Sequence, residues 1–445
     1  MTSGANLGRE LRATAALAAP VVAGQVAHVG MGFVDTLMAG HYAPAALAAV
    51  AVGSSVWIVL LLFLLGTLAA VTPQVAQLRG AGRGADITHL TRQALWLSQL
   101  IGWPAAALLV HAGPLLDGFA LDTAFRPQAE AYLGLIAFGL PGYCAFLALR
   151  FVCEGMGLTA LPMRVGYAGL ALNTLGNALL MFGLLGFPEM GVRGCALATT
   201  LSWWGMAAML LPPFLRGRLH GLGVFDGWEP PRAAGLAAIV HVGLPIGVSY
   251  FLEVSLFSAV ALLMGGLGVV EAAAHQIAIN FAALVFMVPV GIAIATSVRV
   301  GHALGAGDRE GARRAGWAGI GLALLTNTVS ALGIALGHAA IAGLYTADAA
   351  VAALGAQLLL YAAAFQIPDG LQASAAGALR GWQDTPAIMG ITLLAYWGVG
   401  FPAAYVFGVA HGGGPQGLWL GLIAGLAVAA AGLLARYAIR SRRPG

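Results

Sequence analysis

The sequence predicts an all-α integral membrane protein with twelve transmembrane helices in two pseudo-symmetric six-helix bundles. Composition, an internal repeat and the placement of arginine each support this fold class. Of the 445 residues, 60% are hydrophobic and only 9% are charged, and the mean hydropathy is +0.87. About a quarter of the residues of a soluble domain carry charge, so we expect the surface of this chain to face lipid.

Two stretches of the chain repeat each other without a gap, from Pro20 to Gly82 and from Pro245 to Gly307. Each copy has a proline about one turn into an apolar run and ends in the tripeptide Gly-Ala-Gly. An even number of spans between the copies gives both halves the same orientation, related by an axis along the membrane normal. This arrangement is typical of transporters.

Apolar stretches long enough to cross a hydrocarbon core of ~30 Å occur along the whole chain. Because lipid offers no hydrogen-bond partner to the backbone, each stretch is predicted to be helical. The first six lie near residues 14–38, 45–72, 93–113, 129–152, 163–186 and 192–215. The second six lie near residues 234–264, 273–298, 315–337, 351–376, 387–409 and 416–436.

The basic residues predict the orientation. All 21 are arginine, and with both termini inside only Arg126 and Arg193 fall on outer loops, as the positive-inside rule requires. We therefore expect a multi-pass protein of the bacterial inner membrane with both termini in the cytoplasm. The net charge of +4 reflects this topology, and no nucleic-acid partner is expected because the arginines form no single stripe.

A polar segment with Pro230-Pro231 separates the two halves and is predicted to be a linker. The expected division is a first six-helix bundle at 1–218, a cytoplasmic linker at 219–232 and a second six-helix bundle at 233–445.

Three carboxylates, Asp35, Glu253 and Asp369, lie inside the first, seventh and tenth predicted spans. An ionised carboxylate at the bilayer centre costs roughly 2.5 to 3.5 kcal/mol on insertion scales. Each must therefore face a cavity, find a partner or take up a proton. A structural hydrogen bond between helices would explain a single acid, but three acids in two repeats favour exchange of a proton or a monovalent cation.

Asp369 has a helix breaker on each side, Pro368 and Gly370. The proline removes a backbone donor and frees an upstream carbonyl, which could bind a cation together with the carboxylate. An ordinary proline kink is the alternative, because Pro141 stands at the equivalent place in the fourth span. A Na⁺ ion at Glu253 and Asp369 therefore stays an open interpretation.

Amide side chains provide a second group of candidates in the spans. Asn173 and Asn177 lie four residues apart and so on one side of the fifth span, where they could flank Asp35 and bind Na⁺ or a protonated acid. Gln276 and Asn280 lie one turn apart on the eighth span, and Ser55 is the repeat mate of Asn280. These three could line a central cleft. Polar packing between helices is the alternative for all of them.

Several motifs carry a resemblance over essentially the whole chain. They are VDTLMAG at 34–40, AHQIA at 274–278, PDG at 368–370 and the loop LRGWQDTP at 379–386. In this order, and with the repeat, the chain resembles the multidrug and toxic compound extrusion (MATE) family, in its NorM-like branch.

The resemblance implies two six-helix bundles forming a V-shaped cleft, and export of small organic cations, such as drugs or dyes, by antiport with H⁺ or Na⁺. It implies that Asp35 with Asn173 and Asn177 forms the cation-coupling site of the first half, and that Glu253 with Asp369 forms that of the second. The positions expected to contact substrate are Asp35, Ser55, Gln276, Asn280 and Asp348.

The chain departs from the family pattern at Phe365, where some relatives have a tyrosine one turn before the acid of the tenth span. Loss of that hydroxyl makes Na⁺ coordination in the second half less expected than protonation.

Two other functions stay open from the sequence. A lipid-linked oligosaccharide flippase shares the architecture but would typically need a cleft rich in cations. An intramembrane enzyme would need paired acids at fixed spacing or a DDxxD cluster, and neither is present. We expect a transporter and not an enzyme, monomeric and surrounded by membrane lipid, with no cofactor beyond the coupling ion. No metal site is expected from Cys144, Cys153 and Cys195, which are predicted to be packing residues without CxxC spacing.

Overall fold

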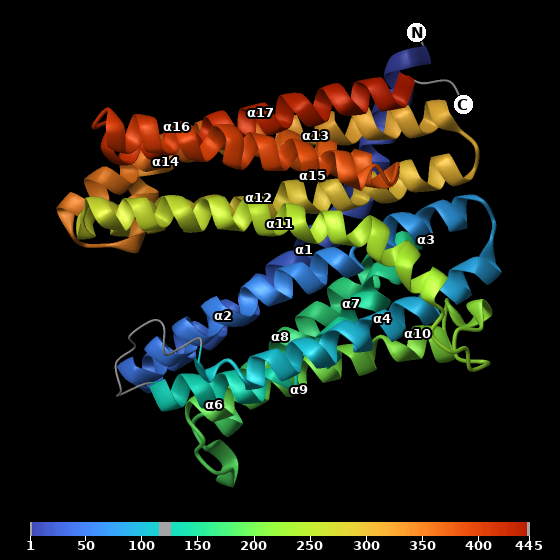
Figure 1. Cartoon of the computed structure of the whole chain (residues 1–445), viewed down its shortest axis with the longest axis horizontal. Helices are drawn as coiled ribbons and strands as arrows, with labels where there is room; N and C mark the ends of the chain where they lie inside the picture. The colour runs from blue at the N-terminus through green and yellow to red at the C-terminus, as the bar shows by residue number, and fades with distance from the viewer. Residues whose placement is uncertain (1, 115–125, 443–445) are drawn as a thin grey trace. The chain divides into compact units, whose positions relative to one another are not determined.

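The computed structural model describes residues 2–114 and 126–442, and every regular element in those ranges is a helix (Figure 1). The first half contains α1 (Thr2–Tyr42), α2 (Pro44–Leu68), α3 (Val71–Gly80), α4 (Gly84–Val110), α6 (Arg126–Ala137), α7 (Leu140–Gly155), α8 (Ala160–Leu180), α9 (Val192–Met209) and α10 (Leu211–Leu215). The second half contains α11 (Ala233–Leu267), α12 (Val269–Gly305), α13 (Arg309–Tyr345), α14 (Ala349–Gly381), α15 (Thr385–Leu393), α16 (Phe401–Tyr405) and α17 (Gly414–Arg442). Two π-helical segments, η3 (Leu394–Gly400) and η4 (Val406–Ala410), flank α16.

The helices have the length and composition of membrane spans. In the described ranges, 10 helical stretches are long and apolar enough to cross a bilayer, and α6 with α7, bent by 43° at their break, makes an eleventh. The more polar α8, with 21 residues, occupies the place of the fifth predicted span. The predicted fold class, an all-α multi-pass membrane protein, is confirmed.

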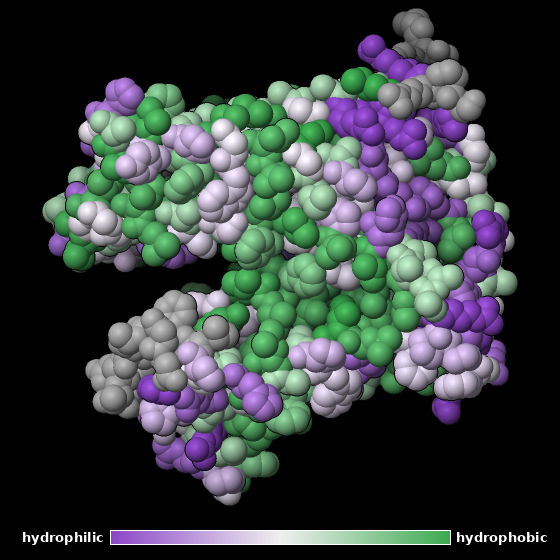
Figure 2. Space-filling model, in the orientation of Figure 1, coloured by the Kyte–Doolittle hydropathy of each residue, from purple (hydrophilic) through white to green (hydrophobic). Residues whose placement is uncertain are grey.

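Large apolar side chains lie on the outside of the helices. Leu336 on α13 is 88% exposed and Leu262 on α11 is 79% exposed, values that suit contact with acyl chains. Hydrophobic residues cover much of the visible face in Figure 2, whereas hydrophilic residues gather near the C-terminal end of α17.

The described helices form two compact units. The N-unit comprises Ala23–Gly247, and the C-unit comprises Met1–Val22 together with Val248–Gly445. Their boundaries, after Val22 and after Gly247, stand at equivalent positions of the repeat. The start of α1 therefore packs in the C-unit and the start of α11 packs in the N-unit. The sequence-based division at 1–218 and 233–445 stays a prediction.

Specific contacts attach each exchanged helix start to its unit. In the C-unit the Arg299 guanidinium donates to Thr14 Oγ1 at 2.7 Å and pairs with the Glu10 carboxylate. In the N-unit Gln74 Nε2 donates to the Ala238 carbonyl at 2.9 Å. Gly243 of α11 lies so close to Thr67 of α2 that a Cβ there would overlap the Thr67 carbonyl oxygen.

The segment after α10 is tied to the start of α4 within the N-unit. Arg92 donates from Nε to the Val224 carbonyl and from Nη2 to the Gly223 carbonyl, both at 2.8 Å. Trp96 Nε1 donates to the Glu229 carbonyl at 2.8 Å. The predicted linker is therefore an ordered polar cap on α4.

The Glu229 carboxylate is the electrostatic centre of this cap. Its Oε1 lies 2.7 Å from His89 Nδ1 and 3.4 Å from Arg232 Nε, and Oε2 lies 3.6 Å from Arg92 Nη1. Desolvation alone would raise the pKa of Glu229, but the hydrogen bond with His89 and the charges of His89, Arg232 and Arg92 outweigh it. Together they lower the pKa below its ordinary value of 4.5.

We predict that Gly243→Ala destabilises the protein by about 1–3 kcal/mol, because a methyl group must displace backbone at a close helix contact. Gly333→Ala in α13 is the matched control, since no atom lies within 4 Å of its built Cβ. This control should gain about 0.5–1 kcal/mol from the lower chain entropy of alanine in a helix. Thermal unfolding in detergent measures both, and equal shifts of the two variants would contradict the close contact.

We also predict that the protein loses the stability contributed by the ionised Glu229 carboxylate when the solution is made acidic. A carboxyl whose pKa is lowered on folding contributes stability above its unfolded pKa, and that contribution is lost as the pH falls through the folded pKa. Glu229→Gln should therefore unfold at a lower temperature than the wild type at pH 7, and the difference should shrink below about pH 4. A difference that stays constant from pH 7 to pH 3 would contradict this.

Candidate cation-coupling sites

Asp35 lies on α1 in the N-unit, 6% exposed, and is surrounded by donors from α8 and α9. Asn173 Nδ2 donates to Asp35 Oδ1 at 3.0 Å, and Asn177 Nδ2 donates to the same oxygen at 2.6 Å. The Thr199 hydroxyl donates to Asp35 Oδ2 at 2.9 Å and accepts a hydrogen bond from Asn173 Nδ2 at 3.0 Å. The one-turn spacing of the two asparagines thus brings both amides to one carboxylate, as their sequence positions suggest.

The amide oxygens of this site accept no hydrogen bond from the described residues. Asn173 and Asn177 are fully buried, and within the described ranges neither Oδ1 atom has a hydrogen-bond partner. Asp35 also forms no ion pair with a described basic residue. Buried acceptors without donors are costly in a membrane. A protonated carboxyl could donate to one of these oxygens, and Na⁺ could be bound by several of them.

The sequence did not identify one member of this site, Thr199, whose hydroxyl donates to Asp35 Oδ2. Cys195 is fully buried four residues before it on α9 and therefore lies on the same face of that helix. The spacing that singled out Asn173 and Asn177 would have found this second face too.

In the C-unit, Glu253 of α11 and Asp369 of α14 come together at one amide. Gln372 Nε2 lies 3.5 Å from Glu253 Oε1 and 3.4 Å from Asp369 Oδ1, both long hydrogen bonds. Asp369 and Gln372 are 3% and 4% exposed. Two carboxylates that share one donor repel each other if both are ionised. A proton or a monovalent cation on the pair, or a cationic ligand nearby, would therefore stabilise it.

Tyr396 completes this site from the eleventh span. Its hydroxyl donates to Gln372 Oε1 at 3.2 Å, and the side chain is fully buried. Tyr396 lies within the π-helical segment η3, and such wider turns are frequent at functional sites. Neither Gln372 nor Tyr396 was identified from the sequence, although Gln372 lies only one turn beyond Asp369.

Phe365 is part of an aromatic cluster next to this site. Its ring centre lies 5.9 Å from that of Phe257 and 5.6 Å from that of Trp419. Where some relatives are expected to offer a hydroxyl, this chain thus has a packed ring. The guanidinium of Arg380 is the nearby positive charge: it interacts electrostatically with Glu253 and lies 5.2 Å from the centre of the Tyr250 ring.

The remaining predicted substrate residues lie apart from these hydrogen bonds. Ser55 is exposed on α2 and donates to the Ala51 carbonyl at 2.9 Å. Gln276 and Asn280 are exposed on α12 and bond each other at 3.1 Å. Asp348 caps the N-terminus of α14, where Oδ1 accepts from the amides of residues 350 and 351 at 2.9 and 3.0 Å. Their contact with substrate stays a prediction.

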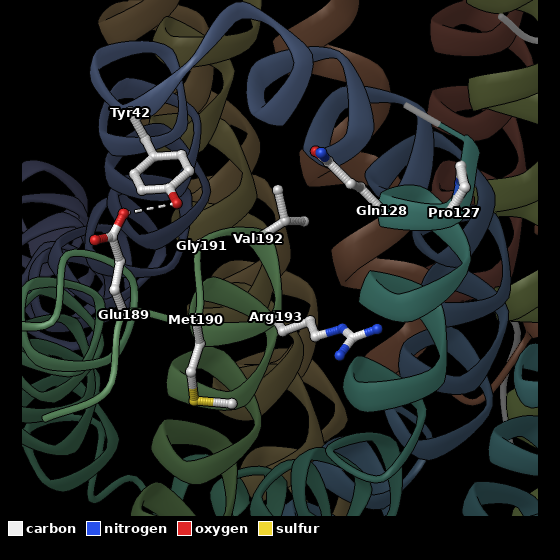
Figure 3. Close-up of a pocket in the computed structure, with 8 residues that line it drawn as sticks. All are labelled: Tyr42, Pro127, Gln128, Glu189, Met190, Gly191, Val192 and Arg193. Atoms are coloured by element: carbon white, nitrogen blue, oxygen red, sulfur yellow. Dashed lines mark hydrogen bonds between the residues drawn. The ribbon is translucent and has the colours of Figure 1, made fainter. Parts of the chain in front are cut away.

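A cavity of about 470 Å³ lies where α1 ends in the N-unit (Figure 3). The Tyr42 hydroxyl donates to Glu189 Oε1 at 2.9 Å on one side of it, Gln128 of α6 lies on the other side, and Arg193 extends from α9 towards α6. Tyr42 is two turns beyond Asp35 on the same helix. The cavity thus marks a polar end of the N-unit near its buried acid. In the described ranges, no group of three or more His, Cys, Asp or Glu side chains could hold a metal ion.

The repeat that organises both sites is also the unit of a known family. The family model described as MatE matches the chain twice, at residues 20–179 and 245–406. The chain belongs to the MATE family. The two matches begin at Pro20 and Pro245, the starts of the two repeat copies. As a MATE protein the chain is a transporter and not an enzyme, as predicted.

Curated relatives place the chain in the NorM-like branch. It is 44% identical over 435 residues to the probable multidrug resistance protein NorM of Xanthomonas campestris pv. campestris. The aligned region covers 98% of this chain and 95% of that protein. It is 43% identical over 449 residues to the multidrug resistance protein PmpM of Pseudomonas aeruginosa, covering 100% of this chain and 94% of that protein.

The fold also matches a solved structure. An outward-facing multidrug resistance MATE family transporter aligns with a TM-score of 0.88 at 21% identity, covering 99% of this chain and 98% of that one. At this identity the match supports the fold alone.

We predict that Thr199→Val slows export by about 10- to 100-fold, the effect of one lost hydrogen bond to a charged group. The valine keeps the size of the side chain but leaves Asp35 Oδ2 without its donor. Thr199→Ser restores the hydroxyl and should recover most of the rate. Initial rates of dye export from proteoliposomes measure the effect, and equal rates for the valine and serine variants would remove Thr199 from the site.

Proposed function

We propose that this chain exports small organic cations, drugs or dyes, by antiport with H⁺ or Na⁺. The observation that carries the proposal is the acid pair Glu253–Asp369, which shares the single donor Gln372 and is therefore stabilised by a proton or an added positive charge. The multidrug resistance names of the NorM and PmpM relatives support the class of substrate. No cofactor besides the coupling ion is proposed.

Competition for the carboxylates provides the coupling. A cationic substrate enters and neutralises an ionised acid. A proton or Na⁺ arriving from outside then takes over the carboxylate, the substrate loses its counter-charge, and it leaves. Asp35 in the N-unit and the acid pair in the C-unit offer this exchange independently, because the two sites have separate hydrogen-bond networks.

The two sites differ in how narrowly they select the coupling ion. In the C-unit, Gln372 presents its N–H group to the acids, and the Tyr396 hydroxyl is engaged with Gln372 Oε1, so few oxygen ligands remain for Na⁺. We propose that this pair couples to H⁺. In the N-unit the free oxygens of Asn173 and Asn177 suit either a proton or Na⁺.

The placement of the protein follows from its charges. The concentration of arginines on one side supports a bacterial inner-membrane location with both termini in the cytoplasm. We propose a monomer as the working state, since each repeat provides its own carboxylates.

A flippase for lipid-linked oligosaccharides fits less well. Such a protein would need uncompensated cations to hold phosphates. The buried arginine of the N-unit, Arg150, is neutralised by Glu154 at 2.7 Å, and the two side chains are 5% and 2% exposed.

We predict that Asp369→Asn and Glu253→Gln each slow ΔpH-driven export of an ethidium-like dye by about 100-fold or more, because one carboxylate alone no longer requires the exchanged proton. Glu310→Gln is the matched control, since this exposed acid at the start of α13 pairs with Arg313 and lies outside both carboxylate networks. Export is measured in proteoliposomes with a pH gradient and a Na⁺ gradient imposed separately. Undiminished export by both variants under both gradients would reject the assignment.

A further inference from the structure

Several buried polar side chains of the C-unit have terminal atoms without a hydrogen-bond partner among the described residues, and four of them are amides or hydroxyls on α12, α13 and α14. Gln366 on α14 is fully buried, and neither its Oε1 nor its Nε2 is bonded. The same holds for Asn327 Oδ1 on α13, Ser374 Oγ on α14 and Ser297 Oγ on α12, in side chains at most 3% exposed. Unpaired polar atoms are costly in a protein core, and more so inside a membrane.

Two of these side chains, Gln366 and Ser374, lie on one line of α14, and the other two belong to α13 and α12. Gln366, Gly370 and Ser374 are spaced by four residues and therefore form one stripe of the helix. Asn327 packs on this stripe at Gly370, where a built Cβ would overlap its amide. The stripe continues to Gly381, and a Cβ on that residue would lie 2.9 Å from the Ser297 carbonyl oxygen. At 1.5 Å per residue, Gln366 and Gly381 are about 22 Å apart.

Small residues explain how α12 and α13 approach this stripe so closely, but not why polar side chains are kept there. In membrane bundles buried amides and hydroxyls usually bond across helices. Here none of the four does: Asn327 Nδ2 donates to the Ala323 carbonyl of its own helix at 2.8 Å, and the remaining terminal atoms have no partner among the described residues. Buried water is the partner that such groups have in folded proteins, and one water molecule satisfies two to four of them.

We propose that this seam, formed by Gln366, Asn327, Ser374 and Ser297, binds a line of ordered water molecules within the C-unit. Asp369 borders the seam, because it precedes Gly370 and lies one turn beyond Gln366. The opposite side of the acid faces Gln372 and Glu253. The water line thus connects the acid pair with the end of α14 that carries Arg380, and protons travel along it. This second statement rests on the proposed antiport.

The variant Gln366→Met tests the water sites without any assumption about transport. Methionine has nearly the volume of glutamine, and no hydrogen bond to protein is lost. If the seam is dry, removing two unpaired polar atoms raises the melting temperature. If the seam binds water, methionine displaces a water molecule and leaves Asn327 and Ser374 without their partner, so the melting temperature falls, by about 2–4 °C. An unchanged or higher melting temperature overturns the proposal.

A double-mutant cycle sharpens the result. Gln366→Met and Asn327→Leu should be non-additive, because both act on shared water molecules. Gln366→Met and Thr328→Val should be additive, since Thr328 is half-buried on the same helix as Asn327 and its hydroxyl donates to the Leu324 carbonyl of that helix. Additivity in both cycles contradicts a shared water line.

The proton route is tested separately in proteoliposomes. Gln366→Met should slow ΔpH-driven dye export by about tenfold, the effect on a rate of losing one hydrogen-bonded link. Binding of the dye to the detergent-solubilised protein should stay unchanged. A lower melting temperature with normal export would retain the water sites and overturn the route. A wild type without ΔpH-driven export would contradict the proposed function and leave the water sites standing.

Discussion

The structure depends on one constraint: inside a bilayer a carboxylate must obtain from the protein everything that water would supply. The two units meet this constraint in opposite ways. Asp35 receives three short hydrogen bonds, from Asn173, Asn177 and Thr199, which stabilise its ionised form. Glu253 and Asp369 share one distant donor, which cannot stabilise two negative charges. The first site thus gives one carboxylate several donors, whereas the second relies on a proton or a cation to offset the repulsion of two carboxylates.

The repeat explains the common frame but not this difference. His28 is the repeat mate of Glu253, and it lies among aromatic rings, 6.1 Å from Tyr143 and 5.6 Å from Phe146 between ring centres. The first half thus packs a ring where the second half has its acid. Duplication supplied two equivalent bundles, and substitution at equivalent positions then gave each unit its own acid. Two non-identical sites can bind and release cations at different steps.

The sequence was sufficient where a property depends on one helix. Hydropathy predicts the spans, and four-residue spacing places Asn173 and Asn177 on one face. Contacts between helices could not be predicted in this way. Tyr396 donates to Gln372 from a π-helical segment of the eleventh span, which its hydropathy pattern does not reveal. The exchange of the starts of α1 and α11 between units likewise depends on packing, which a single sequence does not reveal.

The orientation of one amide links the C-unit site to its ion. Because Tyr396 donates to Gln372 Oε1, the N–H group of that amide must point towards the acids. A Na⁺ ion between the acids would meet the positive end of this dipole, whereas a proton on either carboxyl leaves an oxygen to accept from it. Phe365 adds no oxygen, since its ring is packed against Phe257 and Trp419. A tyrosine at this position would restore a ligand for Na⁺, so the aromatic packing around Phe365 and the hydroxyl of Tyr396 together favour a proton at this pair.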